Sequence, residues 1–458
     1  MSSIVPTDSG QVTQGLPSKS PQPFFFKLDP TQSNDLKNFW KRLIDLIYSE
    51  GSNPIDPIDL ELKSVIHESL DLEGNKIGQE KFKVALWNWI MMDDPDVMVT
   101  KFIRARKWDI SLALKMLINC LKWRIENKID ELKENEQIKK QLKTGKTFVH
   151  GVDRNGSPIF RIFASRHKTS DQSAKDVEEF VLYSMESTRY FVVPPVEAST
   201  ILVNLSGFGM SSMDWKVNNF MIKCLEAYYP ETLNAQIIHN APWIFQGIWK
   251  IITTMLDPVV KSKVTFTSSN QDLLKVIDKS VLLASEGGDS DWEWSIPDYS
   301  MDHDNKYLND SETRSKELAN RQRLTEIFID TTRQWIAADS DQSNEVIQCR
   351  ELLKLMLRAH YFKLMPYVKP LLVYHHQKTL DPAEPGVVRF QLNRQKDSES
   401  NQGSNPNCGN KENNAEYKTN ELVIGKETAR KALLQLIDET KNRFKDDGIQ
   451  FPMIDFEI

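Results

Sequence analysis

Residues 227–264 read AYYPETLNAQIIHNAPWIFQGIWKIITTMLDPVVKSKV. A short run in this stretch, 236–239, and a second that begins at its last residue, 264–267, have the apolar or β-branched composition and the length of strands. The residues between them, about 242–256, repeat apolar side chains at helical spacing. A strand, a helix and a second strand in succession predict two parallel strands, with the helix crossing over one face of their sheet.

The helix predicted at 242–256 is apolar on two faces. Asn240 can cap it, Pro242 can stand in its first turn, and Leu256-Asp257-Pro258 ends it. The inward stripe comprises Ile244, Ile248, Ile251, Ile252 and Met255. A second stripe comprises Phe245, Trp249 and Leu256, with Trp243 beside them. A helix of this kind is either buried on all sides or in contact with lipid. Two interpretations therefore stay open, a core helix and a movable gate over a lipid cavity.

The alternation of strand and helix continues on both sides of this stretch. Strands are predicted at 158–163 and 200–205, and helices at about 174–192, 211–228 and 270–276. This alternation predicts an α/β fold with a substantially parallel sheet. Each helix can then cover a face of the sheet as it crosses between strands.

Farther upstream the sequence is helical. Two packed antiparallel helices are predicted at about 94–127, where Asp94, followed by Pro95, caps the first and Asp109 caps the second. Another helix has an apolar face formed by Leu36, Phe39, Trp40, Leu43 and Ile44. A further helical stretch is predicted at about 80–92.

The 458 residues divide into five predicted regions. They are a disordered lead at 1–22, a helical N-terminal extension at 23–93, a helical segment at 94–140, an α/β domain at 141–300 and a mostly helical C-terminal extension at 301–458. The last region contains predicted helices at about 314–336, 344–360 and 426–444, and a polar, low-complexity flexible loop at 394–418.

Composition and charge exclude several classes of protein. Lys and Arg number 58 against 64 Asp and Glu, a net charge of −6, which argues against a nucleic-acid binder. The N-terminus has no secretory signal, and no apolar run reaches the roughly 18 residues of a membrane span, so any membrane contact is peripheral. The cysteines, Cys120, Cys224, Cys349 and Cys408, lie far apart without zinc-site spacing, so we expect a reduced, intracellular compartment.

Motifs of catalysis are scarce. The segment LKTGKT (142–147) ends in GKT, but Lys140 stands where a P-loop needs glycine. The glycines of LSGFGM (205–210) do not fit a dinucleotide-binding loop, and neither a GxSxG elbow nor an HExxH motif occurs. His375 and His376 are better explained as a solvated pair than as metal ligands. We therefore expect no enzyme activity, no metal and no cofactor.

A basic cluster lies at the turn between the two helices at 94–127. It comprises Lys101, Arg104, Arg106 and Lys107. Arginine suits phosphate because its planar guanidinium presents a fork of donors. Taken singly, however, such residues are more often solvated surface charges, so the cluster alone does not establish a phosphate site.

Four segments together resemble the CRAL-TRIO superfamily, and within it the fungal phosphatidylinositol transfer proteins. They are FIRARKWDISLALKMLINCLKWR (102–124), DRNGSPIF (153–160), AYYPETLNAQIIHNAPWIF (227–245) and LDPVVKSKV (256–264). The four segments occur in the order and at the spacing of that superfamily, across about 94–285. The resemblance covers less than half of the chain strongly.

The resemblance implies an α/β fold whose sheet floors a hydrophobic cavity closed by a gate helix. The gate would be the helix at 242–256, with Trp243, Ile244, Phe245, Ile248, Trp249 and Ile252. In members that transfer phosphatidylinositol, an Arg, a Glu, a Thr and a Lys hold the headgroup. These positions are similar to Arg106, Glu231, Val260 and Lys263, so the threonine hydroxyl is absent here.

The resemblance to the site for a second lipid, phosphatidylcholine, is weaker. A family serine corresponds to Ser199, but its hydroxyl partner corresponds to Ile201. Two family tyrosines correspond to Val149 and Phe160. We therefore expect phosphatidylinositol binding to be retained and phosphatidylcholine binding to be altered or lost, with another apolar molecule as a candidate second ligand.

The function expected from this resemblance is transfer of phosphatidylinositol between cytosolic faces of membranes. The protein would be cytoplasmic, would contact membranes peripherally and reversibly, and would bind no nucleic acid. Two alternatives stay open. One is a carrier or sensor for a different hydrophobic ligand, such as a sterol, a tocopherol-like molecule or haem. The other is a lipid-gated regulatory scaffold whose C-terminal extension, 301–458, binds a protein partner.

Overall fold

The computed structural model describes most of the chain. The described residues are 28–49, 56–71, 73–74, 76–299, 306–338, 343–393, 421–452, 454 and 456–458, with the backbone of 5–6 and 11–13. Within the lead predicted to be disordered, two short strands are assigned, β1 (Val5–Pro6) and β2 (Gln11–Thr13). The rest of that lead and the loop predicted at 394–418 lie outside the described residues.

The N-terminal part of the chain forms a helical lobe. Its helices are α1 (Pro30–Ile47), α2 (Pro57–Glu68), α3 (Gly78–Ile90), α4 (Pro95–Ala105) and α5 (Ile110–Glu126). Four of them begin behind an aspartate whose carboxylate accepts a backbone N–H, namely Asp29, Asp56, Asp94 and Asp109. The apolar face predicted for α1 is confirmed as buried, and the helix pair predicted at 94–127 is α4 packed against α5.

A five-stranded sheet follows, and its strands are ordered as they occur in the chain. They are β3 (Thr147–Val152), β4 (Pro158–Phe163), β5 (Ser199–Asn204), β6 (Leu233–His239) and β7 (Val264–Thr267). Strands β4 to β7 are parallel, and β3 pairs with β4 in the antiparallel direction. The predicted α/β fold with a mixed, largely parallel sheet is confirmed.

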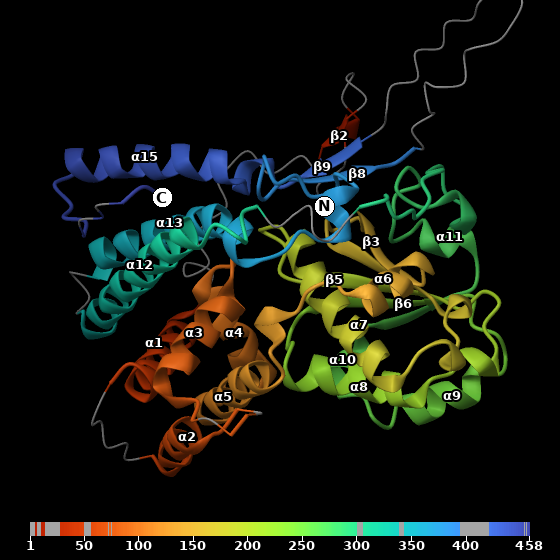
Figure 1. Ribbon diagram of the computed structural model, residues 1–458, viewed down its shortest axis with the longest axis horizontal. Helices are drawn as coiled ribbons and strands as arrows, with labels where there is room; N and C mark the ends of the chain where they lie inside the picture. Colours follow the sequence, from red (N-terminus) through yellow and green to blue (C-terminus); the bar gives the residue numbers. More distant parts are fainter. Residues whose placement is uncertain are drawn as a thin grey trace, which may run out of the picture.

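The crossing helices lie together because the parallel strands are consecutive. They are α7 (Ala174–Thr188), α8 (Trp215–Ala227), α9 (Phe245–Ile252) and α10 (Pro258–Ser262). Right-handed crossovers between consecutive parallel strands all pass over the same face of a sheet. In Figure 1 α8, α9 and α10 accordingly lie below the sheet.

The opposite face of the sheet is covered by other parts of the chain. Leu202 and Ile237 pack there with side chains of α11 (Asn270–Leu273) and β8 (Val388–Gln391), in a cluster that includes Leu273. The helix α6 (Glu136–Lys143) and the short helix α14 (Val373–His376) contribute to the same cluster. The sheet therefore has one face filled by a hydrophobic core and one face beneath the crossing helices.

The edge strand β3 was not predicted from the sequence. Its pairing with β4 shifts register between Val149 and Val152, as at a β-bulge, so the run TFVHGV lacks regular alternation. Gly151 has φ +69°, and a Cβ there would lie 2.3 Å from Val281. Glycine is required at this bend because the sheet meets the residues that cover its opposite face.

The C-terminal part of the chain joins the N-terminal lobe. Its long helices are α12 (Ser311–Ala337), α13 (Ser343–Val368) and α15 (Arg430–Asp446), and β9 (Glu421–Ile424) pairs with β8 and β2. The three helices predicted in this region are confirmed. Side chains of α12, α13 and α15 share one hydrophobic cluster with those of α1 to α5, and these helices lie beside the N-terminal lobe in Figure 1.

Candidate functional site

A cavity of about 850 Å³ lies between the sheet and the crossing helices and extends to α4, α13 and α15, where Met98, Lys354 and Leu433 line it. Strand residues alternate between the two faces of a sheet, and alternate residues of three strands therefore line this cavity. They are Phe160 and Ile162 of β4, Ser199, Ile201 and Val203 of β5, and Gln236 and Ile238 of β6. A cavity of this volume is at the upper end of the range typical of small-molecule sites, roughly 300–1,000 Å³.

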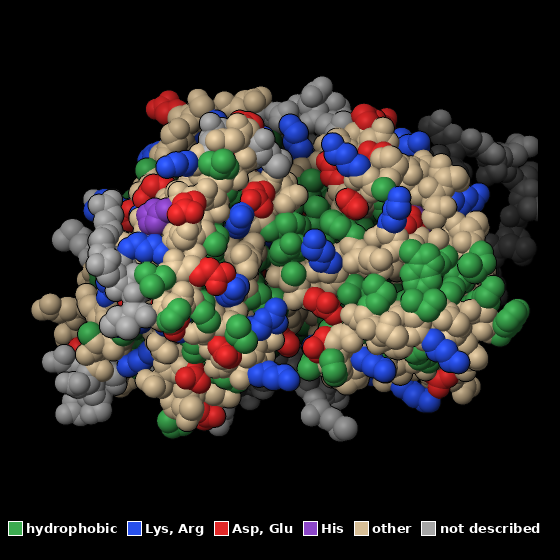
Figure 2. Space-filling model, turned by 90° about the horizontal axis from the view of Figure 1, so that it is seen from below, with side chains coloured by type: hydrophobic (Ala, Val, Ile, Leu, Met, Phe, Trp, Pro, Cys, Tyr) green, Lys and Arg blue, Asp and Glu red, His purple; other side chains and the backbone are tan. Residues whose placement is uncertain are grey.

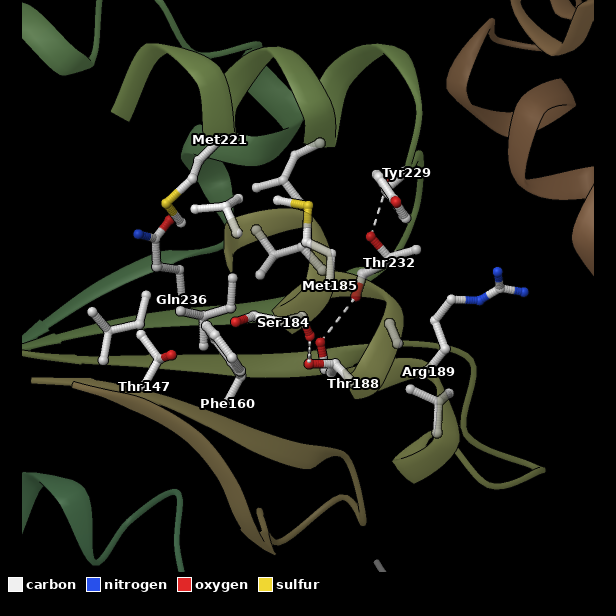
Figure 3. A pocket seen from close by; sticks show the side chains of 18 of the residues that line it. Thr147, Phe160, Ser184, Met185, Thr188, Arg189, Met221, Tyr229, Thr232 and Gln236 are labelled. Atoms are coloured by element: carbon white, nitrogen blue, oxygen red, sulfur yellow. Dashed lines mark hydrogen bonds between the residues drawn. The ribbon is translucent and has the colours of Figure 1, made fainter. Parts of the chain in front are cut away.

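The helices supply the other wall of the cavity. Figure 3 shows Met185 of α7 and Met221 of α8 facing Phe160 and Gln236 of the sheet. Methionine side chains are flexible and adapt to ligands of irregular shape. The hydroxyl of Ser184 donates to the carbonyl of Phe180 at 2.8 Å, and that of Thr188 donates to the carbonyl of Ser184 at 2.7 Å. These polar groups are satisfied by their own helix, so they leave the wall suited to hydrocarbon.

The predicted gate helix is α9, which is shorter than the predicted range 242–256. The Asn240 cap is wrong, because Asn240 has φ +54° and its amide donates to Ser206 Oγ at 3.0 Å. Pro242 precedes the helix, which begins at Phe245 without a side-chain cap. The helix thus occupies only the middle of the apolar segment, and turns on either side carry the rest.

The second of the two apolar stripes, Phe245, Trp249 and Leu256, lines the cavity. Ile252 of the first stripe and Val260 of α10 line it as well. Ile248 is buried, but Ile251, which was assigned to the inward stripe, is 51% exposed. The inward assignment of that residue is therefore wrong, because the sheet lies on the side of the aromatic stripe.

The outer side of this region carries exposed hydrophobic side chains. Trp243 is 83% exposed, and Met210, Ile251, Val259 and Phe266 are each about half exposed. Figure 2 shows hydrophobic side chains gathered over the side of the molecule that holds α9, with Lys and Arg nearby. Exposed apolar patches of this kind mark contacts with proteins or membranes.

Two of the expected headgroup residues lie together. The Lys263 ammonium lies 3.7 Å from the Glu231 carboxylate and donates to the Leu233 carbonyl at 2.8 Å. Both residues precede strands, at the amino ends of β6 and β7, and both are partly exposed. Val260 lines the cavity three residues before Lys263. Glu231 and Lys263 themselves are not among the lining residues, although Pro230 and Thr232, on either side of Glu231, are.

Arg106 is not joined to this pair by a contact among the described residues. It ends α4, and its guanidinium donates to the Ala105 carbonyl at 3.0 Å. Its neighbours in the basic cluster, Lys101 and Arg104, both bind Glu197. Lys101 is buried and donates to the Glu197 carbonyl at 2.7 Å, and Arg104 donates to the Glu197 carboxylate at the same distance. The interpretation of Lys101 as a solvated charge is therefore wrong, because it holds the segment before β5.

Three of the four residues expected at the second lipid site line the cavity, and the fourth does not. Phe160, Ser199 and Ile201 all line the cavity. Val149 is instead buried in the core cluster on the other side. The Ser199 hydroxyl lies 3.4 Å from the Thr232 carbonyl, so it is only weakly engaged within the protein.

A buried charge network beside the cavity was missed by the sequence analysis. Arg124 donates to Glu186 at 2.8 Å and to Asp130 at 2.7 Å, and the Tyr229 hydroxyl donates to Glu186 at 2.6 Å. Burial alone would raise the pKa of Glu186, but Arg124 and Arg189 outweigh it and hold that pKa well below its usual range. Arg124 and Tyr229 lie in two of the segments that resemble the superfamily, and this position was the one indication in the sequence that they have a role.

Among the described residues, no helix is long and apolar enough to cross a membrane. A family model described as "CRAL/TRIO domain" matches residues 142–288, and one described as "CRAL/TRIO, N-terminal domain" matches residues 35–119. The second match begins inside the region interpreted above as an N-terminal extension.

Curated relatives match much of the chain. The "CRAL-TRIO domain-containing protein C3H8.02" of Schizosaccharomyces pombe is 34% identical over 74% of this chain and 78% of its own length. The "Phosphatidylinositol transfer protein CSR1" of Eremothecium gossypii is 35% identical over 68% of this chain and 73% of its own. A solved structure titled "Crystal structure of Sfh5" covers 53% of this chain and 83% of its own, at 18% identity and a TM-score of 0.37. The chain belongs to the CRAL/TRIO family.

Proposed function

We propose that the protein binds one phospholipid, phosphatidylinositol, in the cavity and exchanges it between cytosolic membrane faces without covalent chemistry. The observation that carries this proposal is the construction of α9. Its aromatic stripe lines the cavity, while Ile251 on the same helix and Trp243 just before it are exposed to the outside. One short element thus separates an apolar interior from an apolar outer surface.

The contacts of α9 support its role as a gate. Phe245 and Ile248 pack in a small hydrophobic cluster with Leu205 and Ile238, separate from the two large cores. Lys250, the one charged residue of α9, is exposed and forms no ion pair with any described residue. Outward movement of α9 would therefore break apolar contacts that a bilayer can replace.

Lipid capture is energetically reasonable in a cavity of this kind. Each buried CH₂ contributes about 0.8 kcal/mol, so one acyl chain of about 16 carbons gains on the order of 12 kcal/mol relative to water. The bilayer offers the same gain, and exchange between the two is therefore near balance. Specificity must come from the headgroup, for which Glu231 and Lys263 supply an acceptor and a cation at 3.7 Å from each other.

The name of the Eremothecium relative, which is 35% identical to this chain, supports phosphatidylinositol as the ligand. A second candidate function, transport of another apolar molecule, is favoured by Val260 and Ile201, which lack the hydroxyls of the family pattern. A protein partner for the C-terminal extension stays a prediction. The helices of that extension share a hydrophobic core with the N-terminal lobe, so they stabilise that lobe whether or not they bind a partner.

The experiment that tests the proposal is native mass spectrometry of the purified chain, followed by lipid extraction. We expect one phosphatidylinositol per chain. A single bound molecule of another class would retire phosphatidylinositol and favour the second candidate. A chain that carries no lipid and exchanges none between vesicles would contradict the proposed use of the cavity.

A further inference from the structure

One end of the cavity contains a buried lysine that the proposed function does not use. Lys146 immediately precedes β3, lines the cavity and is only 4% exposed. Its ammonium lies 5.2 Å from the centre of the Phe180 ring, and no carboxylate of the described residues forms an ion pair with it. Burial lowers the pKa of Lys146 to about 8, although Asp171 and Asp214 oppose this shift. A cation held this way lacks a direct counter-charge.

The hydrogen bonds of Lys146 leave capacity for a ligand. Its ammonium donates to Gln141 Oε1 at 2.9 Å, and its distances to His167 Nδ1 and Gln172 Oε1 are both 3.4 Å. An ammonium has three donors, and N–H···O bonds are normally 2.7–3.2 Å long. One donor is well satisfied, and two are held only loosely.

His167 presents a further donor at the same place. Its Nδ1 faces the Lys146 ammonium and therefore accepts, which leaves the proton on Nε2. That Nε2 is buried and has no hydrogen-bond partner among the described residues, and the Asp214 carboxylate lies 3.5 Å away. Asp214 also accepts the Val217 N–H at the start of α8. Burial and the nearby Lys146 lower the pKa of His167, although Asp214 opposes this shift.

This group lies at the opposite end of the sheet from Glu231 and Lys263. Thr147 pairs with Ile162 near the carboxyl end of β4, whereas Glu231 and Lys263 precede β6 and β7 at the amino ends. The parallel strands between these ends are about five residues long, which separates the two polar groups by roughly 17 Å along the strand direction alone. Lys146 and His167 line the cavity, whereas Glu231 and Lys263 are not among its lining residues, so the two polar groups are separate sites.

We propose that Lys146 and His167 bind the anionic group, a carboxylate or a phosphate, of a lipid whose chain lies in the cavity. The inference rests on the proposed use of the cavity for lipid, and it adds a second polar site to it. The ligand oxygen accepts from the loosely held donors of Lys146 and from the weakly engaged Nε2–H of His167, and its charge supplies the ion-pair partner that Lys146 lacks. Burial strengthens such a contact, because water competes little there.

The test measures binding of three single-chain lipids to the full-length protein by isothermal titration calorimetry. Oleate supplies a carboxylate, lysophosphatidate a phosphate, and oleyl alcohol the chain without a charge. We expect Lys146→Met to weaken oleate, lysophosphatidate or both at least tenfold, and to change oleyl alcohol less than twofold. The anion that loses affinity identifies the chemistry. The matched control is Lys143→Met, whose exposed side chain lies three residues earlier, and it should change nothing.

Two results would overturn the inference. In one, the wild-type protein binds oleyl alcohol as tightly as both anions, or all three lose affinity together in the variant. In the other, Lys146→Met lowers the melting temperature sharply, and His167→Phe folds normally yet binds both anions as the wild type does. Phosphatidylinositol exchange is measured on the same proteins. If Lys146→Met still exchanges phosphatidylinositol, the two sites act separately. If the wild-type protein takes up no lipid at all, the proposed function itself is contradicted.

Discussion

Arg350 of α13 and Asp96 of α4 form a buried bidentate ion pair, although 254 residues separate them in the chain. Lys354 lies 2.7 Å from the same carboxylate, and the Trp40 indole donates to it at 2.8 Å. Burial alone would raise the pKa of Asp96, but Arg350 and Lys354 outweigh it and hold that pKa well below its usual range. The C-terminal extension and the N-terminal lobe are thus joined by charge as well as by apolar packing.

Arg350→Met should lower the free energy of unfolding by about 3–5 kcal/mol, because it leaves Asp96 and its neighbours with a reduced counter-charge in the interior. Urea unfolding followed by circular dichroism measures this loss. Arg333→Met is the control, since Arg333 pairs with Asp330 on the exposed side of α12, and its change should stay within about 1 kcal/mol.

A chain cut before α12 should fail to fold, because the N-terminal lobe shares its core with the C-terminal helices. A truncated chain that folds and binds lipid would show that the lobe does not need these helices.

Lys263→Ala and Glu231→Ala should each reduce phosphatidylinositol transfer about tenfold, because a charge-assisted hydrogen bond contributes about 1.5–3 kcal/mol. Arg106→Ala tests the third residue implied by the family resemblance. Transfer between vesicles measures the effect, with melting temperature as the check on folding. Lys261→Ala, on an exposed neighbouring lysine, is the matched control. Unchanged transfer in all three variants would refute the headgroup assignment.

Val260→Thr should strengthen phosphatidylinositol binding by up to about tenfold, because it restores a hydroxyl beside Lys263 at the cavity wall. The adjacent Val259 is 47% exposed and does not line the cavity, so Val259→Thr is a control of the same chemistry. Competition binding against a fluorescent phosphatidylinositol measures both. Equal effects of the two substitutions would show that the hydroxyl acts nonspecifically.

Replacing both Trp243 and Ile251 with Ser should weaken association with vesicles at least tenfold. These side chains are 83% and 51% exposed, and burying them in a bilayer contributes about 1.5–3 kcal/mol each. Vesicle flotation measures the effect, and the melting temperature should stay unchanged because neither side chain is packed in a core. Leu112→Ser on α5, with a side chain 46% exposed, is the control. An equal loss in that control would point to general hydrophobicity.

His375 is buried, so its interpretation as one of a solvated pair is wrong, and it should make the protein less stable in mild acid. Burial, with a smaller effect of His376, lowers the pKa of His375 from 6.5 to about 4. Between these values the unfolded chain binds the proton and the folded chain does not, so stability falls as the pH drops through this window. His375→Gln should therefore reduce the loss of unfolding free energy between pH 7.5 and pH 5 by about 2 kcal/mol. The exposed His67→Gln should leave that loss unchanged.

The sequence predicted those parts of the fold that depend on neighbours along the chain. The strands at 158–163 and 264–267 were placed to the residue, because their apolar runs end at clear turn signals. Which face of α9 lines the cavity could not be predicted, because both of its stripes are apolar and the choice is made by the sheet. The Asn240 cap failed because the backbone there turns into the left-handed region.

The site was predictable only where it coincides with motifs. Glu231 and Lys263 lie in quoted motifs, and the structure brings them together. The pairing of Asp96 with Arg350 and the burial of Lys146 depend on segments that are distant in sequence or lack a periodic signal. No local sequence pattern predicts such contacts, because they form only when segments distant in the sequence pack together.

The shared core of the first and last helices has a consequence for synthesis on the ribosome. The α1–α5 lobe buries its apolar side chains partly against α12, α13 and α15, and α15 ends at Asp446. After α5 has been made, about 320 further residues must be translated, which takes roughly 15–60 s at 5–20 residues per second. During that interval the nascent chain exposes the apolar face of its earliest helices, so the strands β3 to β7 can pair before the lobe that precedes them is complete, whereas the cavity, which α13 and α15 also line, closes only afterwards.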